Sequence, residues 1–163
     1  MKKAIAVLCP TRNRPDKAKE AWQSWKDTNA GLSDFVYVLD EDDESNYPRH
    51  EGARYIVAPK GRRGMTDPVN YAARILATEY ECVHFIGDDH VFRTRNWDRY
   101  FMWAVEELGG WGFVYGNDLL QGENLPTECL ITSNIIRTLG HMVWPELIHL
   151  WIDNYWLALG RGL

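Results

Sequence analysis

The chain has 163 residues, of which 45% are apolar and 25% charged, as in ordinary globular proteins that bury one sizeable core. Its net charge of −5 argues against a general affinity for nucleic acid or anionic membranes. An anionic ligand would therefore need a local basic cluster or a metal ion.

The cysteines and the N-terminus bound the class of protein further. Cys9, Cys82 and Cys129 are widely spaced and odd in number, which argues against a disulfide framework and favours buried thiols in a cytoplasmic protein. The apolar run behind the basic N-terminus stops at Pro10, so we expect neither a signal peptide nor a transmembrane segment. With no repeat or linker in sight, we expect a single domain over residues 1–163.

The first half of the chain alternates between apolar runs and amphipathic stretches. Residues 4–9 predict a strand bounded by Pro10, and Pro15 suits the first turn of a helix. The apolar face of that helix consists of residues at helical spacing, namely Ala18, Ala21, Trp22 and Trp25. Residues 35–39 predict the next strand, so the order is strand, helix, strand, which favours a parallel sheet.

The remaining elements extend this α/β pattern. Further strands are predicted at residues 54–58, 82–86, 113–115 and 129–132. We expect Asp67, Asn96 and Ser133 to cap helices that end near residues 80, 108 and 140, and residues 145–159 to be helical in part. The fold class is therefore α/β, with helices flanking a mostly parallel sheet.

The apolar run that begins at Cys82 ends abruptly in Asp88, Asp89 and His90. Two adjacent carboxylates repel each other unless a proton or a cation neutralises them, and Mg²⁺ and Mn²⁺ prefer oxygen ligands. Because open α/β sheets bind ligands at the carboxyl ends of their strands, we predict a divalent-metal site here. A solvated acidic turn is the alternative.

Two other strand ends carry polar clusters that would lie along the same edge. Arg12 and Arg14 follow the first strand, and guanidinium groups match phosphate oxygens. Asp40 ends the second strand, where it can accept hydrogen bonds from a base or ribose. Arg62 and Arg63 precede a helix N-terminus, which is a second anion site. Together the clusters describe a site for a nucleoside diphosphate, although loop arginines are often only solvated.

The order of these residues resembles the nucleotide-sugar-binding half of GT-A-fold glycosyltransferases. It is most similar to the large inverting family whose first strand ends in a Pro-Thr-x-Asn-Arg-like loop. The matching residues are Cys9-Pro10-Thr11-Arg12-Asn13-Arg14, Asp40, Gly64, Asn70 and Phe85-Ile86-Gly87-Asp88-Asp89. The resemblance covers roughly residues 5–156. It implies a Rossmann-like GT-A fold and metal-dependent sugar transfer, with inversion, from a nucleoside-diphosphate sugar, a UDP-sugar being favoured.

The resemblance also implies roles for single positions. The nucleotide-sugar would be bound by Pro10, Thr11, Arg12, Arg14, Asp40, Arg63, Gly64, Asn70 and Asp88. Asp89 would be the favoured Mn²⁺ or Mg²⁺ ligand, with Asp88 and His90 as further candidates. The chain departs from the pattern because either Gly87 replaces the first Asp of the family's motif or His90 replaces the last.

A short acceptor-side segment is implied near the C-terminus, over residues 130–140 and 149–156. Asp153 matches the family's catalytic base there, and a helix cap is its alternative role. His141 and His149 are candidates for a further metal ligand, but only ten residues follow Asp153, so we expect that ligand to be missing or replaced by water. Trp144 and Trp151 are candidates to stack on an acceptor sugar, with core packing expected for at least one.

Two rival functions remain open. A sugar nucleotidyltransferase usually has a Gly-rich loop after the first strand, and residues 10–15 contain no glycine. A non-catalytic nucleotide- or glycan-binding module is the other rival. The acceptor is an unidentified glycan, protein or other hydroxyl compound, we expect no nucleic-acid partner, and a homo-oligomer is left open.

Overall fold

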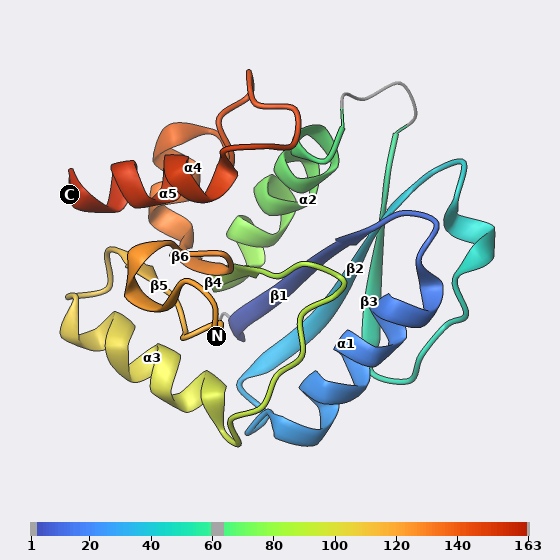
Figure 1. Ribbon diagram of the computed structural model, residues 1–163, viewed down its shortest axis with the longest axis horizontal. Helices are drawn as coiled ribbons and strands as arrows, with labels where there is room; N and C mark the ends of the chain where they lie inside the picture. Colours follow the sequence, from blue (N-terminus) through green and yellow to red (C-terminus); the bar gives the residue numbers. More distant parts are fainter. Residues whose placement is uncertain (1–2, 60–63, 163) are drawn as a thin grey trace.

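The structure, a computed structural model, describes residues 3–59 and 64–162, and its core is a mostly parallel sheet with helices on both faces (Figure 1). The strands within these residues are β1 (Lys3–Thr11), β2 (Ser33–Asp40), β3 (Ala53–Ala58), β4 (Tyr80–Phe85), β5 (Phe113–Val114) and β6 (Cys129–Thr132). The helices are α1 (Pro15–Thr28), α2 (Thr66–Glu79), α3 (Trp97–Glu107), α4 (Ser133–Leu139) and α5 (Ile152–Arg161), with 3₁₀ turns at Glu44–Asn46 and Gly122–Asn124.

The strand order in the sheet is β3-β2-β1-β4-β6-β5. The first four of these strands run parallel, and β6 is antiparallel to both β4 and β5. The register pairs Thr11 with Leu39 and Leu8 with Phe85, so β1, β2 and β4 end along one edge. The α/β class predicted from the sequence is thus confirmed, and the three polar strand ends do share an edge.

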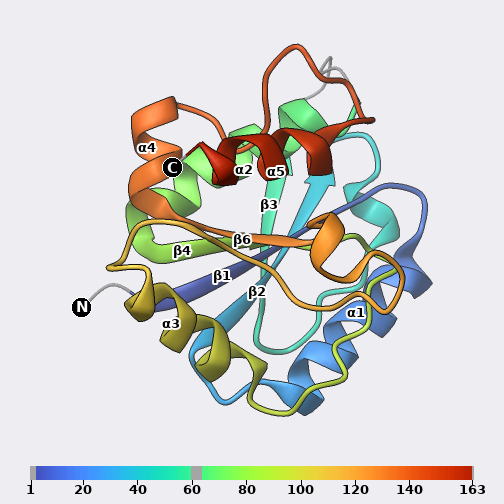
Figure 2. The ribbon, with the colours of Figure 1, turned by 60° about the vertical axis from the view of Figure 1, so that its left-hand side comes forward.

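Successive side chains of β4 point to opposite faces of the sheet, and each face has its own helices. Val83 and Phe85 pack on the face covered by α2, α4 and α5, whereas Cys82 and Ile86 belong to the face covered by α1 and α3 (Figure 2). The α1 residues predicted to face the core are all buried. The cysteines are buried and form no disulfide, as predicted.

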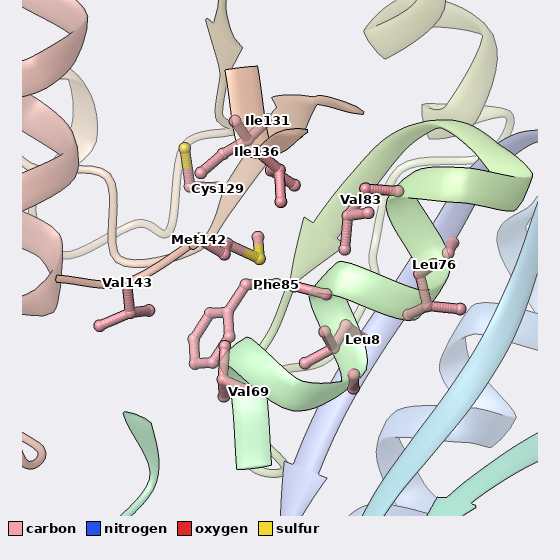
Figure 3. Packing of buried hydrophobic residues seen from close by; sticks show 14 of the residues in the cluster. Leu8, Val69, Leu76, Val83, Phe85, Cys129, Ile131, Ile136, Met142 and Val143 are labelled. Atoms are coloured by element: carbon pink, nitrogen blue, oxygen red, sulfur yellow. The ribbon is translucent and has the colours of Figure 1, made fainter. Parts of the chain in front are cut away.

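Trp156 joins α5 to the first of these faces, whose packing is shown in Figure 3. Its side chain is 1% exposed, and its indole Nε1 donates a hydrogen bond of 2.9 Å to the carbonyl of Met142. Its ring lies 5.1 Å from that of Phe85, the last residue of β4. This packing fixes the start of α5 near the carboxyl end of β4.

Asn70 ties the segment after α4 to α2. Its side-chain oxygen accepts hydrogen bonds of 2.9 Å from the amides of Met142 and Val143, and its nitrogen donates one of 2.7 Å to the carbonyl of Val143. The side chain is buried, so water does not compete for these hydrogen bonds.

Helix starts differ from the sequence predictions. α2 begins at Thr66, so Asp67 lies inside the first turn, where its charge still favours the helix dipole. The amides of Met65 and Thr66 instead donate to the carbonyl of Ile148, which is a cap supplied by a distant segment. Asn96 occupies the cap position of α3 without a side-chain cap bond, and Ser133 is the first residue of α4 and not its cap.

None of the helices within the described residues combines the length and the apolar character needed to cross a membrane.

Replacing Trp156 with Ala is expected to lower the free energy of unfolding by about 3–5 kcal/mol, because it leaves a cavity and an unpaired Met142 carbonyl. Urea unfolding followed by circular dichroism measures this loss. Trp103→Ala is the matched control, since Trp103 on α3 is 61% exposed, and it should change stability by no more than about 0.5 kcal/mol. Equal effects of the two substitutions would contradict the packing described.

Asn70→Ala removes the partners of three buried backbone groups and should cost about 3 kcal/mol or more. Hydrogen exchange gives the specific readout, because the Met142 and Val143 amides should exchange faster well before global unfolding. Asn154→Ala, at an exposed position of α5, serves as the control. Unchanged protection of both amides in Asn70→Ala would refute the assigned contacts.

Candidate active site

The ends of β1 and β4 are joined through side chains. The Thr11 hydroxyl donates a hydrogen bond of 2.8 Å to Asp88 and lies 3.0 Å from the hydroxyl of Tyr47. Tyr47 also accepts a hydrogen bond of 3.2 Å from the amide of Arg14. These hydrogen bonds hold the loop after β1 against the Asp88–Asp89 turn.

The two adjacent carboxylates have different surroundings. The Asp88 side chain is 8% exposed, whereas that of Asp89 is 57% exposed. Arg14 spans them, with one nitrogen 2.9 Å from Asp88 and the other 3.4 Å from Asp89. Burial raises the pKa of Asp88, against the opposing effects of Thr11 and Arg14. Asp88 is therefore an anchored carboxylate, and Asp89 is the one open to a ligand.

Gly87 lies against the side chains of the turn that follows it. A β-carbon there would lie 2.8 Å from a carboxylate oxygen of Asp89 and 3.6 Å from the ring of His90. The turn is closed by a 3.1 Å hydrogen bond from the His90 amide to the Gly87 carbonyl. An aspartate at position 87 would require the exposed Asp89 side chain to turn aside, while the present turn carries its acids at 88 and 89.

Arg12 and Asp40, predicted to bind phosphate and base separately, are paired with each other. Arg12 lies 2.6 Å from Asp40 and makes two bonds, of 2.7 and 3.0 Å, to Asp42. The hydrogen bonds to Asp42 and Asp40 raise the pKa of Arg12. A ligand that uses either residue must therefore compete with this ion pair, and the predicted roles of Arg12 and Asp40 stay predictions. Pro10 is buried at the end of β1, beside them.

Two residues that shape this edge were missed from the sequence. Asp43 is buried and accepts hydrogen bonds of 2.6 Å from the Asn13 amide and 2.7 Å from the Asn46 side chain. Tyr47 was not singled out at all. Residues 40–44 are five consecutive acids, which gave only a weak signal for Asp43, because the sequence does not show which carboxylate of the run is buried. The roles of both residues arise from contacts between loops that are far apart in the sequence.

The α2 side of the edge includes two more predicted positions. Gly64 has φ +47°, and a β-carbon there would clash with the backbone of Ile148. Asn70, as described above, contacts the Met142–Val143 backbone, so its predicted place beside a nucleotide-sugar stays a prediction. Arg62 and Arg63, predicted to bind phosphate, lie outside the described residues.

Asp153 lies in the first turn of α5. The helix is capped at Trp151 without a side-chain bond, so Asp153 is not its N-cap residue. Burial raises the pKa of Asp153, and the charges of nearby His90 and His149 oppose that rise. His90, in the Asp89 turn, therefore lies close enough to Asp153 to act on it electrostatically.

The other acceptor-side candidates are placed as follows. His141 lies 2.9 Å from the hydroxyl of Tyr155, and His149 is exposed. Trp144 and Trp151 are both exposed, so the expectation that at least one packs in the core is wrong. Trp144 lies beside the rings of His141 and Tyr155, at 5.5 and 6.4 Å between ring centroids, but still leaves 47% of its surface exposed.

The donor set at Asp88 and Asp89 suits a hard cation held partly by a substrate. No group of three or more His, Cys, Asp or Glu side chains within the described ranges is arranged to hold a metal. Mg²⁺ and similar ions are often held by one or two carboxylates together with substrate phosphates and water. The exposed Asp89 carboxylate, backed by anchored Asp88, fits that mode.

No protein-family model and no curated protein sequence matches the chain. Among solved structures, it is similar to the mannosyltransferase PcManGT from Pyrobaculum calidifontis in complex with GDP-Man and Mn²⁺, with 15% identity and a TM-score of 0.68, over 94% of this chain and 50% of that chain. TarS from S. aureus gives 13% identity and 0.68, over 96% and 33%. Rv0371c from Mycobacterium tuberculosis H37Rv, in complex with manganese, gives 11% and 0.63, over 99% and 84%.

The chain thus spans about half the length of the mannosyltransferase chain and a third of the TarS chain. At these identities the likeness concerns the fold. The resemblance noted in the sequence is confirmed at that level, and the chain has the fold of GT-A glycosyltransferases.

Proposed function

We propose that this chain is a metal-dependent glycosyltransferase that transfers a sugar from a nucleoside-diphosphate sugar to an acceptor hydroxyl, with inversion at the anomeric carbon. The observation that carries the proposal is the arrangement at the end of β4. Anchored Asp88 and exposed Asp89 share this edge with the guanidinium of Arg14, and half-buried Asp153 in α5 lies near enough for His90 to act on it electrostatically. Sugar transfer from a nucleoside diphosphate needs a cation, groups that bind phosphate and a general base.

The donor would bind across the ends of β1 and β2. Its diphosphate would contact Arg14 and Arg12, with Pro10 and Thr11 beneath it and Asp40 toward the base or ribose. Gly64, Asn70 and Arg63 would border the sugar from the α2 side. The resemblance favours a UDP-sugar, and the similar mannosyltransferase in complex with GDP-Man makes GDP-sugars the first alternative.

Asp89 would hold Mn²⁺ or Mg²⁺, with Asp88 and His90 as supporting candidates. When bound, the ion would neutralise the departing diphosphate as a Lewis acid. Arg14 already contacts both carboxylates, so it can turn toward a phosphate oxygen without leaving the site. Positive groups that are fixed where charge develops contribute most to such a transfer.

Asp153 would act as the general base. It would remove the proton from the acceptor hydroxyl while that oxygen forms its bond to the anomeric carbon, and the electron pair of the broken bond would leave with the diphosphate. Burial raises the pKa of this carboxyl, which makes it a stronger base than an exposed aspartate.

A panel of UDP-, GDP- and dTDP-sugars tests donor binding by thermal shift with and without Mn²⁺. At 100-fold excess over Kd, a ligand stabilises the fold by about 2.7 kcal/mol, which corresponds to roughly 5–10 °C for a chain of this size. Asp89→Asn should abolish the Mn²⁺-dependent part of the shift and leave the ligand-free Tm unchanged. Asp27→Asn, an exposed acid at the far end of α1, should behave as wild type.

If no nucleotide raises the Tm in the presence of metal, the central proposal is wrong. Pyrophosphate release from a nucleoside triphosphate would point to a sugar nucleotidyltransferase instead. Stabilisation by a nucleotide without sugar transfer or donor hydrolysis would leave only a nucleotide-binding module.

Asp153→Asn should lower the transfer rate at least 100-fold while the nucleotide-induced thermal shift persists, because the base acts on the acceptor and not on the donor. The neighbouring exposed residue supplies the control, and Asn154→Ala should keep wild-type turnover. Transfer by Asp153→Asn at close to the wild-type rate would remove Asp153 from the mechanism.

A further inference from the structure

A cavity of about 710 Å³ lies beside the Asp89 turn, on the α1 and α3 face of the sheet. Its walls are residues 89–97, α3, and the 116–128 segment that leads into β6. Asp89 and His90 line one end, so the cavity reaches the candidate metal turn. The donor roles proposed above lie on the other side of this turn, over β1 and β2, and leave the cavity unused.

The floor of the cavity holds a buried histidine. His84, in β4, is 1% exposed, and its Nε2 makes a hydrogen bond to the carboxylate of Glu128. Its Nδ1 is buried without a partner within the described residues, and the rings of Trp97 and Phe101 lie 5.2 and 5.1 Å away. A proton on Nδ1 would have no acceptor, so this geometry assigns the proton to Nε2, which donates to Glu128.

Glu128 is held from both sides. One oxygen accepts from His84 and the other from the amide of Gly116, at the far wall. A β-carbon at Gly116 would lie 3.0 Å from that oxygen, so a larger residue there would push the carboxylate slightly away. Each carboxylate oxygen can accept more than one hydrogen bond, and the 15% exposed side chain lines the cavity. Glu128 thus presents immobilised acceptors to a ligand that carries donors.

The rest of the wall limits the chemistry of that ligand. Tyr100 and Phe92 offer aromatic faces, while Asn117 and Thr127 offer polar groups. Asp89, Asp118 and Glu128 on the wall disfavour an anion, against one cation, Arg93. A neutral molecule with apolar C–H faces and several hydroxyl donors fits this lining, and sugar rings have that character.

We propose that this cavity is the acceptor pocket and takes a neutral saccharide, with Glu128 accepting hydrogen bonds from its hydroxyls and His84 as the positioning residue behind Glu128. The inference rests on the proposed function, since it places the acceptor of that reaction next to the Asp89 turn. The saccharide enters from the α3 side and the donor from the β1 side, and the reacting hydroxyl lies at the Asp89–His90 end of the cavity, toward Asp153.

The probes are the methyl glycosides of glucose, galactose, mannose and N-acetylglucosamine, observed by saturation-transfer NMR on the full chain with Mn²⁺ and either UDP or GDP. At least one glycoside should bind in the millimolar range. Glu128→Gln and Tyr100→Ala should each raise its Kd at least tenfold, about 1.4 kcal/mol. Trp103→Ala is the matched control, because Trp103 is as exposed on α3 as Tyr100, at 61%, and does not line the cavity.

The outcomes separate this inference from the proposed function. Intact nucleotide shifts in Glu128→Gln and Tyr100→Ala, with weakened glycoside binding, support the pocket. Absence of glycoside binding, or an unchanged Kd in both variants, overturns it and leaves the donor site standing. Glycoside binding without any nucleotide response overturns the acceptor role. The test uses Glu128 and Tyr100 because replacing buried His84 endangers the sheet itself.

Discussion

The organisation of the sheet edge depends on the buried carboxylate of Asp88. An ionised carboxylate is costly to bury unless it is paired and hydrogen-bonded. Thr11 and Arg14, both from the loop that follows β1, supply the hydrogen bond and the charge. The same contacts hold the loop after β1 against the turn after β4, and they leave Asp89 as the exposed carboxylate. Losing one partner would therefore disturb the position of two strand ends as well as one ion pair.

β4 connects this edge to both faces of the molecule. Phe85 points toward Trp156, which fixes α5 and with it Asp153. His84, one residue earlier, points to the opposite face and holds Glu128 beside the cavity. The alternation of one short strand thus places the proposed base on one side of the Asp88–Asp89 turn and the proposed acceptor carboxylate on the other. Strand geometry sets the two directions, and α5 and the segment before β6 supply the two carboxylates.

Features that depend on residues close together in the sequence could be predicted, and features that depend on distant contacts could not. The apolar face of α1 and the run that ends at Asp88 are periodic patterns, and the structure confirms both. The start of α2 was misplaced because its cap is the carbonyl of Ile148, more than 80 residues away along the chain. Glu128 was missed for a similar reason, because it acquires a partner only when β6 pairs with β4. Contacts made by folding leave no mark in a single sequence.

Under the proposed function, the paired arginines are the groups through which an acidic chain would bind a diphosphate. With a net charge of −5, the protein attracts anions only through local cations, and Arg12 and Arg14 are already oriented by carboxylates. A ligand must compete with these carboxylates for the guanidinium groups. It does not have to order the two long arginine side chains, because the ion pairs already hold them in place. With a cation held by Asp88 and Asp89, the Arg14 guanidinium would be free to turn toward phosphate, whereas Arg12 would still be paired with Asp40 and Asp42. In this scheme metal and nucleotide assist each other's binding, because each removes the other's unfavourable charge.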